Sequence, residues 1–283
     1  MHNPDLMLSF EWWFDYSLGK TEDGGRVGEG GESRAGAIGS ETVTGSIIMM
    51  PFAGDPGYGY ASILPPPGHP ARQRFRQLCL PGHGERLKEP LLNNLDAMAA
   101  DLFRQIANLL RPGDVFFGHS MGALLAWLVM RRARTMLFPM PRAVVLSGMR
   151  APSTLTTKGR HGLSRDDLRT ELRRLGGSPD MVLDDDEVFR FFEPQVRADF
   201  QAVETYRYRA EPPLAARAIV LLGAADDVSI ADGQAWRHEF VLPPQVETLS
   251  GGHFFILQHA AAIRQRLLGL LTGTWSLADD IAR

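Results

Sequence analysis

A serine, an aspartate and a histidine, far apart in the chain, each follow a short apolar run. Ser120 lies in the sequence Gly118-His119-Ser120-Met121-Gly122, while Asp226 and His253 come later. A serine hydroxyl is a weak nucleophile at neutral pH, so it needs an imidazole to accept its proton and a carboxylate to orient that imidazole. Since the three residues occur in the order nucleophile, acid, base, we predict that they form one catalytic triad for acyl transfer.

The G-x-S-x-G sequence around Ser120 is flanked by the elements that such a nucleophile requires. The apolar run 115–117 predicts a buried strand, and the run of helix formers 123–130 predicts a helix. A strand, a sharp turn and a helix are the context of a nucleophile elbow, whose glycines leave room for the crossing chain. The alternative is an ordinary glycine-rich turn between a core strand and a core helix.

Two further positions follow predicted strands and bear on the same chemistry. Ala53 follows the run 45–52, at the place where a second backbone N–H donor to an oxyanion is expected. An ordinary strand-ending turn is the alternative there. Asp227 adjoins Asp226 and can also serve as the acid, but we favour Asp226 because it is the third residue after Gly223.

The elements that must position these residues alternate along the chain. Strands are predicted at 45–52, 75–80, 115–117, 143–147, 218–223 and 246–249, with helices at 92–110, after residue 122 and at 257–271. This alternation predicts an α/β fold with a mostly parallel central sheet and helices on both faces. We expect one domain over residues 41–283, preceded by a segment, 1–40, that includes a flexible Gly-rich linker.

Residues 151–213 break the alternation and predict a helical lid inserted between sheet strands. Ser164 and Asp167 predict a capping box at the start of one helix. A second helix is expected to start at Asp184 and end at Pro194, and a third to carry apolar side chains on one face. The aromatic side chains of the insertion can line an acyl pocket or hold the insertion to the body: Phe189, Phe191, Phe192, Tyr206 and Tyr208.

Composition restricts the remaining classes of function. The net charge of −3 and the lack of a long basic stripe argue against nucleic-acid binding. The single cysteine, Cys79, excludes a disulfide within the chain and favours a reducing, cytoplasmic setting, and we expect it to be a buried residue rather than a nucleophile. No run reaches the length of a membrane span, and no metal-ligand spacing or phosphate-binding glycine loop occurs, so we expect no membrane and no cofactor.

Several stretches together resemble the type II, or editing, thioesterases that accompany nonribosomal peptide and polyketide synthases, which have the α/β-hydrolase fold. The matching stretches are 51–54, 80–86, 117–123, Arg197-Ala198-Asp199-Phe200 with Glu204-Thr205-Tyr206, and 251–255. Three positions depart from the family pattern: Phe52, Asp55-Pro56 and His83. The first two lie beside the expected oxyanion loop and bear on its geometry or on substrate choice.

The resemblance implies Ser120 as nucleophile, His253 as base, Asp226 as acid, and the backbone N–H groups of Ala53 and Met121 as the oxyanion hole. It implies acyl groups thioester-linked to the phosphopantetheine arm of acyl or peptidyl carrier proteins as substrates. The implied task is to remove stalled or aberrant acyl groups, and nothing demands more than a monomer. A small-molecule carboxylesterase or lipase-like hydrolase, and a non-catalytic scaffold that binds carriers, are the alternatives.

Several arginines and histidines and one aspartate outside the predicted triad have expected roles in docking, packing or ion pairing. Because carrier proteins of this kind are acidic, Arg72, Arg74 and Arg76, or Arg131, Arg132 and Arg134, can offer a docking patch, although solvated helix faces are the alternative. His119 is expected to pack structurally and His83 to line the mouth of the site. Asp199 is expected to form a structural ion pair in the lid.

Overall fold

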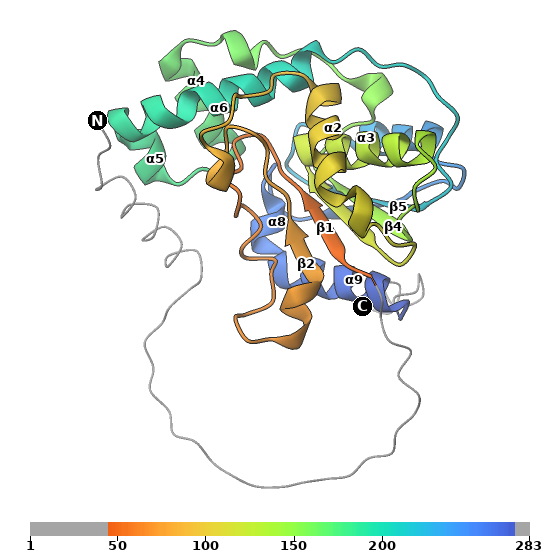
Figure 1. The fold of residues 1–283 in the computed structure, drawn as a ribbon. Helices are drawn as coiled ribbons and strands as arrows, with labels where there is room; N and C mark the ends of the chain where they lie inside the picture. Colours follow the sequence, from red (N-terminus) through yellow and green to blue (C-terminus); the bar gives the residue numbers. More distant parts are fainter. Residues whose placement is uncertain (1–44, 275–283) are drawn as a thin grey trace, which may run out of the picture.

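The structure is a computed structural model that describes residues 45–274, so the predicted segment 1–40 lies outside the described residues. The described part of the chain contains one six-stranded sheet (Figure 1). Its strands are β1 (Ile47–Met50), β2 (Phe75–Gln77), β3 (Val115–His119), β4 (Ala143–Ser147), β5 (Arg217–Gly223) and β6 (Gln245–Leu249). All neighbouring pairs are parallel, in the order β2-β1-β3-β4-β5-β6. The predicted parallel sheet is confirmed.

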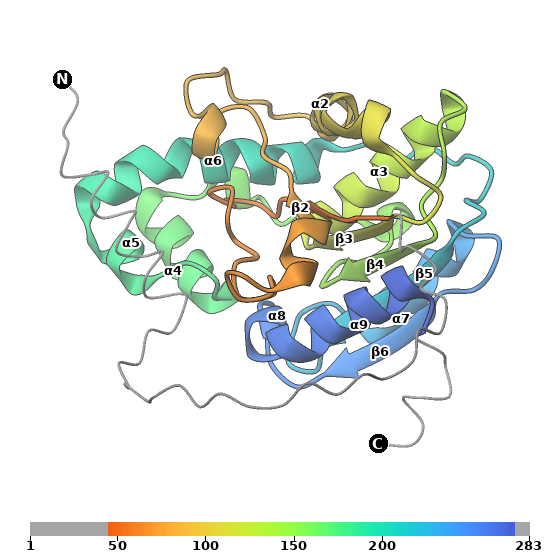
Figure 2. The same cartoon turned by 60° about the horizontal axis from the view of Figure 1, so that its bottom comes forward.

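Helices cover both faces of the sheet, as the alternation predicts (Figure 2). Ile48 and Met50 of β1 face the core that contains α2 (Leu95–Ile106) and α3 (Met121–Thr135). Ile47 and Met49 face the opposite core, which contains α8 (Phe255–Gln258) and α9 (Ala260–Thr272). The short α7 (Ile230–Gln234) packs through Gly233 on β5 and β6. The strands that are buried on both faces consist mainly of apolar residues, so the sequence shows them as continuous apolar runs.

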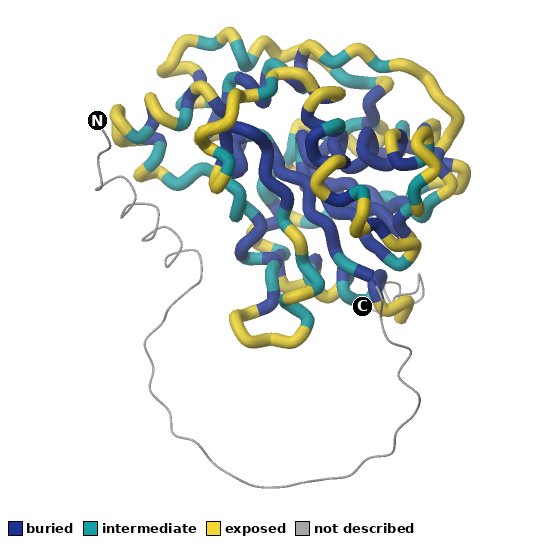
Figure 3. Tube along the Cα trace, in the orientation of Figure 1, coloured by how far each residue is buried: buried dark blue, intermediate teal, exposed yellow. Residues whose placement is uncertain are grey.

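The central strands β1, β3 and β4 are buried along their whole length, and β5 is buried after its first residue, whereas the edge strands are less buried (Figure 3). Because all strands run in the same direction, their carboxyl ends meet at one edge of the sheet. The segments that contain Ala53, Ser120, Asp226 and His253 leave β1, β3, β5 and β6 at that edge. The fold therefore gathers the four predicted positions on one side.

The insertion between β4 and β5 forms a helical cap over this edge (Figure 1). It contains α4 (Arg165–Leu175), α5 (Asp180–Asp184) and α6 (Asp186–Thr205), with a core of its own. Ser164 caps α4 by accepting a bond from the N–H of Asp167, which is one half of the predicted capping box. The carboxylate of Asp167 accepts from the Ser164 hydroxyl instead of the Ser164 backbone N–H. The predicted helix end at Pro194 is wrong, because α6 continues through this proline. Proline in a helix interior costs ~3 kcal/mol, and buried side chains on both sides of it, including Phe189 and Phe200, offset that cost.

Some predicted boundaries shift by a few residues. The strand predicted at 75–80 ends at Gln77, although the following Cys79 is buried as expected. The closing helix is interrupted at His259, which separates α8 from α9. Among residues 45–274, no helix combines the length and the apolar character needed to cross a bilayer.

Candidate active site

Ser120 occupies a strained turn between β3 and α3. Its backbone φ is +52°, a value that residues other than glycine adopt only at a cost of ~1–3 kcal/mol. A Cβ atom at Gly118 would lie 2.0 Å from the carbonyl oxygen of Gly122, and one at Gly122 would lie 2.5 Å from the carbonyl oxygen of Met50. Both glycines are therefore required by close backbone approach. The turn has the geometry of a nucleophile elbow.

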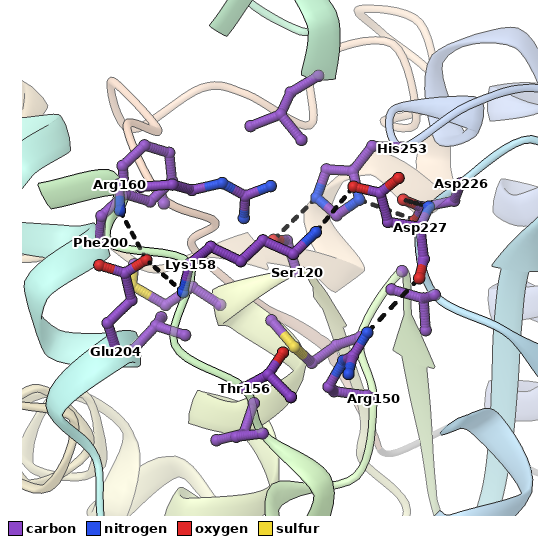
Figure 4. Close-up of a pocket in the computed structure, with 18 residues that line it drawn as sticks. Ser120, Arg150, Thr156, Lys158, Arg160, Phe200, Glu204, Asp226, Asp227 and His253 are labelled. Carbon is purple, nitrogen blue, oxygen red and sulfur yellow. Dashed lines mark hydrogen bonds and ion pairs between the residues drawn. The ribbon is translucent and has the colours of Figure 1, made fainter. Parts of the chain in front are cut away.

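His253 lies between Ser120 and Asp226 (Figure 4). Its Nε2 atom is 3.0 Å from the Ser120 hydroxyl oxygen, and its Nδ1 atom is 2.8 Å from Oδ2 of Asp226. The other carboxylate oxygen of Asp226 accepts a bond from the N–H of Asp227 at 2.7 Å, which fixes the plane of the carboxylate. The structure thus brings together all three residues that the sequence singled out as a triad.

Asp227, the alternative acid, points away from the imidazole. Its carboxylate pairs with Lys158 at 2.8 Å and Arg174 at 2.9 Å, both in the cap. The hydrogen bond from Lys158 is the largest cause that lowers the pKa of Asp227 to about 2. Asp227 therefore joins the β5–α7 loop to the cap, and Asp226 is the carboxylate beside His253.

The two predicted oxyanion donors lie at the same pocket as Ser120. Met121 is the first residue of α3, and a first-turn N–H has no partner within its helix. Ala53 occupies a turn in which the N–H of Asp55 donates to the carbonyl of Phe52, with Gly54 at a φ of +76°. A positive φ at the third position is typical of a type II turn and favours glycine.

The pocket lies between the carboxyl edge of the sheet and the cap, with about 660 Å³ of empty space that includes its open mouth. Its walls combine apolar side chains with three cations, Arg150, Lys158 and Arg160, of which Arg160 pairs with Glu171. Glu204 at the pocket wall accepts bonds from the N–H groups of Lys158 and Arg160 (Figure 4). Its carboxylate also contacts Nδ1 of His161. Glu204 lies in a stretch that carries the family resemblance, but the sequence assigned no site role to it or to Arg150, Lys158 and Arg160, because no local pattern places them beside the nucleophile.

Of the two roles that the sequence left open for the aromatic side chains of the cap, packing is the one that the structure supports, although Phe191 is exposed. Phe189 is in the core of the cap, Phe192 packs against that core, and Tyr206 and Tyr208 pack against the main core. None of these side chains lines the described pocket, whereas Phe200 does. Holding the cap to the body is therefore their main role.

Two histidines near the site have structural environments. His119 is fully buried, with Nδ1 at 3.1 Å from the hydroxyl of Ser147. Burial, and after it the electrostatic effect of the neighbouring His253 imidazole, hold the pKa of His119 well below the usual range, so His119 stays neutral. The expectation that His83 lines the mouth is wrong, since it is buried and pairs with Asp199 at 3.1 Å. Asp199 is therefore paired, as expected, but its partner His83 lies on the loop after β2 and not in the cap.

Several arginines of the two clusters, for which the sequence left open a docking patch or a solvated helix face, make contacts within the chain. Arg131 and Arg134 both pair with Glu211, and Arg131 also lies over the ring of Trp127. Arg72 and Arg74 precede β2 and bond to backbone carbonyl groups. This second cluster lies at the amino ends of the strands, away from the carboxyl edge that carries Ser120. Within residues 45–274, no group of three or more His, Cys, Asp or Glu side chains is arranged to hold a metal ion.

A parallel sheet, an elbow serine, an adjacent histidine and carboxylate, and a helical cap define a serine hydrolase of the α/β-hydrolase fold. Comparison with known proteins narrows this class. The profile of the thioesterase domain family matches residues 62–269. The chain belongs to the thioesterase domain family.

Relatives with known names agree with this assignment. The chain is 33% identical, over 78% of its length, to the probable cadicidin biosynthesis thioesterase of Streptomyces griseus, and spans 61% of that protein. It is 32% identical, over 74% of its length, to the thioesterase PikA5 of Streptomyces venezuelae, and spans 75% of it. The solved type II thioesterase BorB from the borrelidin biosynthetic cluster is 32% identical, with a TM-score of 0.71 over 80% of this chain and 92% of that one. The resemblance to type II thioesterases is therefore confirmed, and the chain is of this type.

Proposed function

We propose that the protein hydrolyses acyl groups from the phosphopantetheine arm of carrier proteins, and so clears stalled or aberrant acyl groups from nonribosomal peptide or polyketide synthases. The main support is the position of His253, within hydrogen-bonding distance of both Ser120 and Asp226 under the cap. The relatives are named for cadicidin biosynthesis and for the borrelidin biosynthetic cluster. All three side chains come from one chain, so a monomer carries a complete site.

In the first half-reaction, the Ser120 oxygen attacks the thioester carbonyl carbon while His253 Nε2 takes the hydroxyl proton. The carbonyl oxygen becomes an oxyanion and accepts bonds from the N–H groups of Ala53 and Met121. When the C–S bond breaks, the pantetheine sulfur leaves with the proton from His253. The products are the free arm and an acyl ester on Ser120.

In the second half-reaction, His253 takes a proton from water, and the resulting hydroxide attacks the acyl ester. Collapse of the second tetrahedral intermediate breaks the bond to Ser120, and His253 returns the proton to the serine oxygen. Asp226 holds the imidazole with Nε2 toward Ser120 and stabilises its positive charge in both steps. No cofactor takes part.

The pocket is suited to an acyl chain whose carbonyl lies at Ser120. Apolar walls from Leu155, Leu175, Phe200 and Val203 favour a hydrocarbon portion, because burying it releases water from apolar surface. The arm enters from the open mouth beside the cap. We place the enzyme in the cytoplasm because its proposed partners, the carrier domains, work there.

Intact-mass spectrometry of acylated carrier proteins, before and after incubation with the enzyme, tests this proposal. We expect loss of the acyl mass with wild type and retention of it with Ser120→Ala. Parallel assays with a simple aryl ester separate the proposal from a general esterase, which would hydrolyse both substrates with comparable kcat/KM. Wild type that leaves both substrates intact would instead identify a non-catalytic carrier-binding protein.

A further inference from the structure

The loop that carries the proposed oxyanion donor is hydrogen-bonded to the cap at one buried point. The N–H of Gly54, next to Ala53, donates to Oδ2 of Asp199 at 2.8 Å. Asp199 lies on α6 and is fully buried. A Cβ at Gly54 would lie about 3 Å from Phe192 and Val196, so the loop packs closely beneath α6. The position of the Ala53 N–H therefore depends on what holds Asp199.

His83 contacts the same carboxylate oxygen and requires a positive charge to satisfy its bonds. Its Nδ1 is 3.0 Å from the carbonyl oxygen of Pro81, and its Nε2 is 3.1 Å from Oδ2 of Asp199. Carbonyl and carboxylate oxygens only accept hydrogen bonds, so both ring nitrogens must carry protons. Hydrogen bonds between charged groups are the strongest in proteins. The geometry thus describes a buried imidazolium–carboxylate pair.

The surroundings of His83 favour this charged state. Burial lowers its pKa, but Asp199, followed by the Pro81 carbonyl and Asp55, outweighs burial and raises it above the usual value. Asp55 is buried in the segment that follows the oxyanion turn. Cys79 donates its thiol to the backbone carbonyl of His83. The guanidinium of Arg86 bonds instead to Asp101 and Glu89, and the charged groups that raise the pKa of His83 are the two carboxylates Asp199 and Asp55.

We propose that His83 and Asp199 are positioning residues of the active site, whose ion pair holds Asp199 Oδ2 against the Gly54 N–H and thereby fixes the Ala53 N–H donor. This inference rests on the proposed role of Ala53 in the oxyanion hole. When His83 loses its proton, the buried Asp199 carboxylate loses its counter-charge, and the neutral imidazole has one N–H left for two acceptors, Pro81 and Asp199. The turn then loosens, and stabilisation of the oxyanion weakens. A misplacement of ~1 Å can cost ~100-fold in rate.

Three variants test the two roles separately. Asp199→Asn retains an oxygen that accepts from Gly54 but removes the charge that keeps His83 protonated. We expect the alkaline decline of kcat to move to lower pH, with KM little changed. Asp199→Ala removes the acceptor and should lower kcat at every pH by ~10–100-fold, less than the ~100–1000-fold for loss of a whole oxyanion donor. His83→Gln keeps one hydrogen-bond donor but carries no charge. Its kcat should equal the value that wild type reaches at a pH where His83 is neutral, and it should not show the alkaline decline that the loss of the His83 proton causes.

Asp114→Asn is the matched control. Asp114 is as buried as Asp199 and also accepts backbone N–H bonds, from Ser46 and Arg111, but it lies at the opposite edge of the sheet. The Asp114→Asn variant should keep the wild-type pH profile.

NMR titration of the His83 ring gives a readout that does not depend on activity. In Asp199→Asn, the pH at which the His83 ring loses its proton should move to lower values, as the alkaline decline of kcat does. Wild-type kcat and pH profiles in Asp199→Asn and His83→Gln would overturn the inference, even if Asp199→Ala failed to fold.

Measuring all variants on an aryl ester as well as on an acyl carrier separates the two proposals. Any ester needs the oxyanion hole, so the pH effects should appear with both substrates. If wild type hydrolysed only the aryl ester, with the effects intact, the carrier assignment would fail and the positioning roles would stand. If carriers were hydrolysed but the variants behaved as wild type, the carrier assignment would stand and the positioning roles would fail.

Discussion

Asp55 is predicted to reduce the stability of the protein at neutral pH. Its side chain is only 2% exposed, and one oxygen, Oδ1, accepts bonds from the N–H groups of Gly57 and Gly59, both at 2.8 Å. Burial is the largest influence and raises the pKa from 3.8 to about 6, against the opposing effects of these N–H groups and of His83. At pH 7.5 the folded protein therefore holds a carboxylate whose charge the fold disfavours.

Asp55→Asn removes this charge while its Oδ1 atom keeps both acceptor bonds. A rise of about two pKa units corresponds to ~3 kcal/mol. We therefore expect the free energy of unfolding of the variant at pH 7.5 to exceed that of wild type by up to this amount. The pKa of Asp55 is higher in the folded protein than in the unfolded chain, so the fold favours the protonated carboxyl. The stability that wild type gains from this protonated form is fully present below pH 3.8 and is lost as pH rises through 6. Lowering the pH from 7.5 to 5 should therefore reduce the difference in free energy of unfolding between variant and wild type by ~1.4 kcal/mol.

Urea unfolding of wild type and variant at pH 7.5 and pH 5.0 measures both quantities. Asp101→Asn is the control of opposite sign. Burial raises the pKa of Asp101, but hydrogen bonds from Arg86 and Gln105 outweigh burial and lower it, so its charge stabilises the fold at neutral pH. This control should be less stable than wild type at both pH values. A less stable Asp55→Asn at pH 7.5, or a stability difference independent of pH, would refute the reasoning.

Further outcomes concern the triad and the elbow. Ser120→Ala should lower kcat by at least ~1000-fold in steady-state assays on an acyl carrier; a smaller loss would exclude it as the nucleophile. Asp226→Asn should lower kcat by ~10,000-fold, whereas Asp227→Asn should cost less than ~10-fold, and the reverse order would identify Asp227 as the acid. Gly118→Ala places a Cβ 2.0 Å from a carbonyl oxygen and should cost ~3 kcal/mol or more in urea unfolding. Gly162→Ala, which meets no atom within 4 Å, should cost far less, and equal losses would contradict the close-approach argument.

The sequence by itself determined the features that depend on local patterns. Buried parallel strands appear as continuous apolar runs, and the elbow appears as glycines around Ser120, because steric contact across one turn dictates both. Chain order then placed Asp226 and His253 after later strands of the same sheet. The helix end at Pro194 was predicted wrongly because a local penalty was weighed without the buried contacts of α6 that offset it.

Only the tertiary structure decided between residues of equal chemical type. Asp226 and Asp227 are neighbours in the chain, yet one faces His253 and the other the cations of the cap, because consecutive side chains in a turn point in different directions. The contact of His83 with Asp199 joins residues 116 positions apart. Nothing in either local sequence indicates it, since burial and the partner of a charge are set by where distant segments pack.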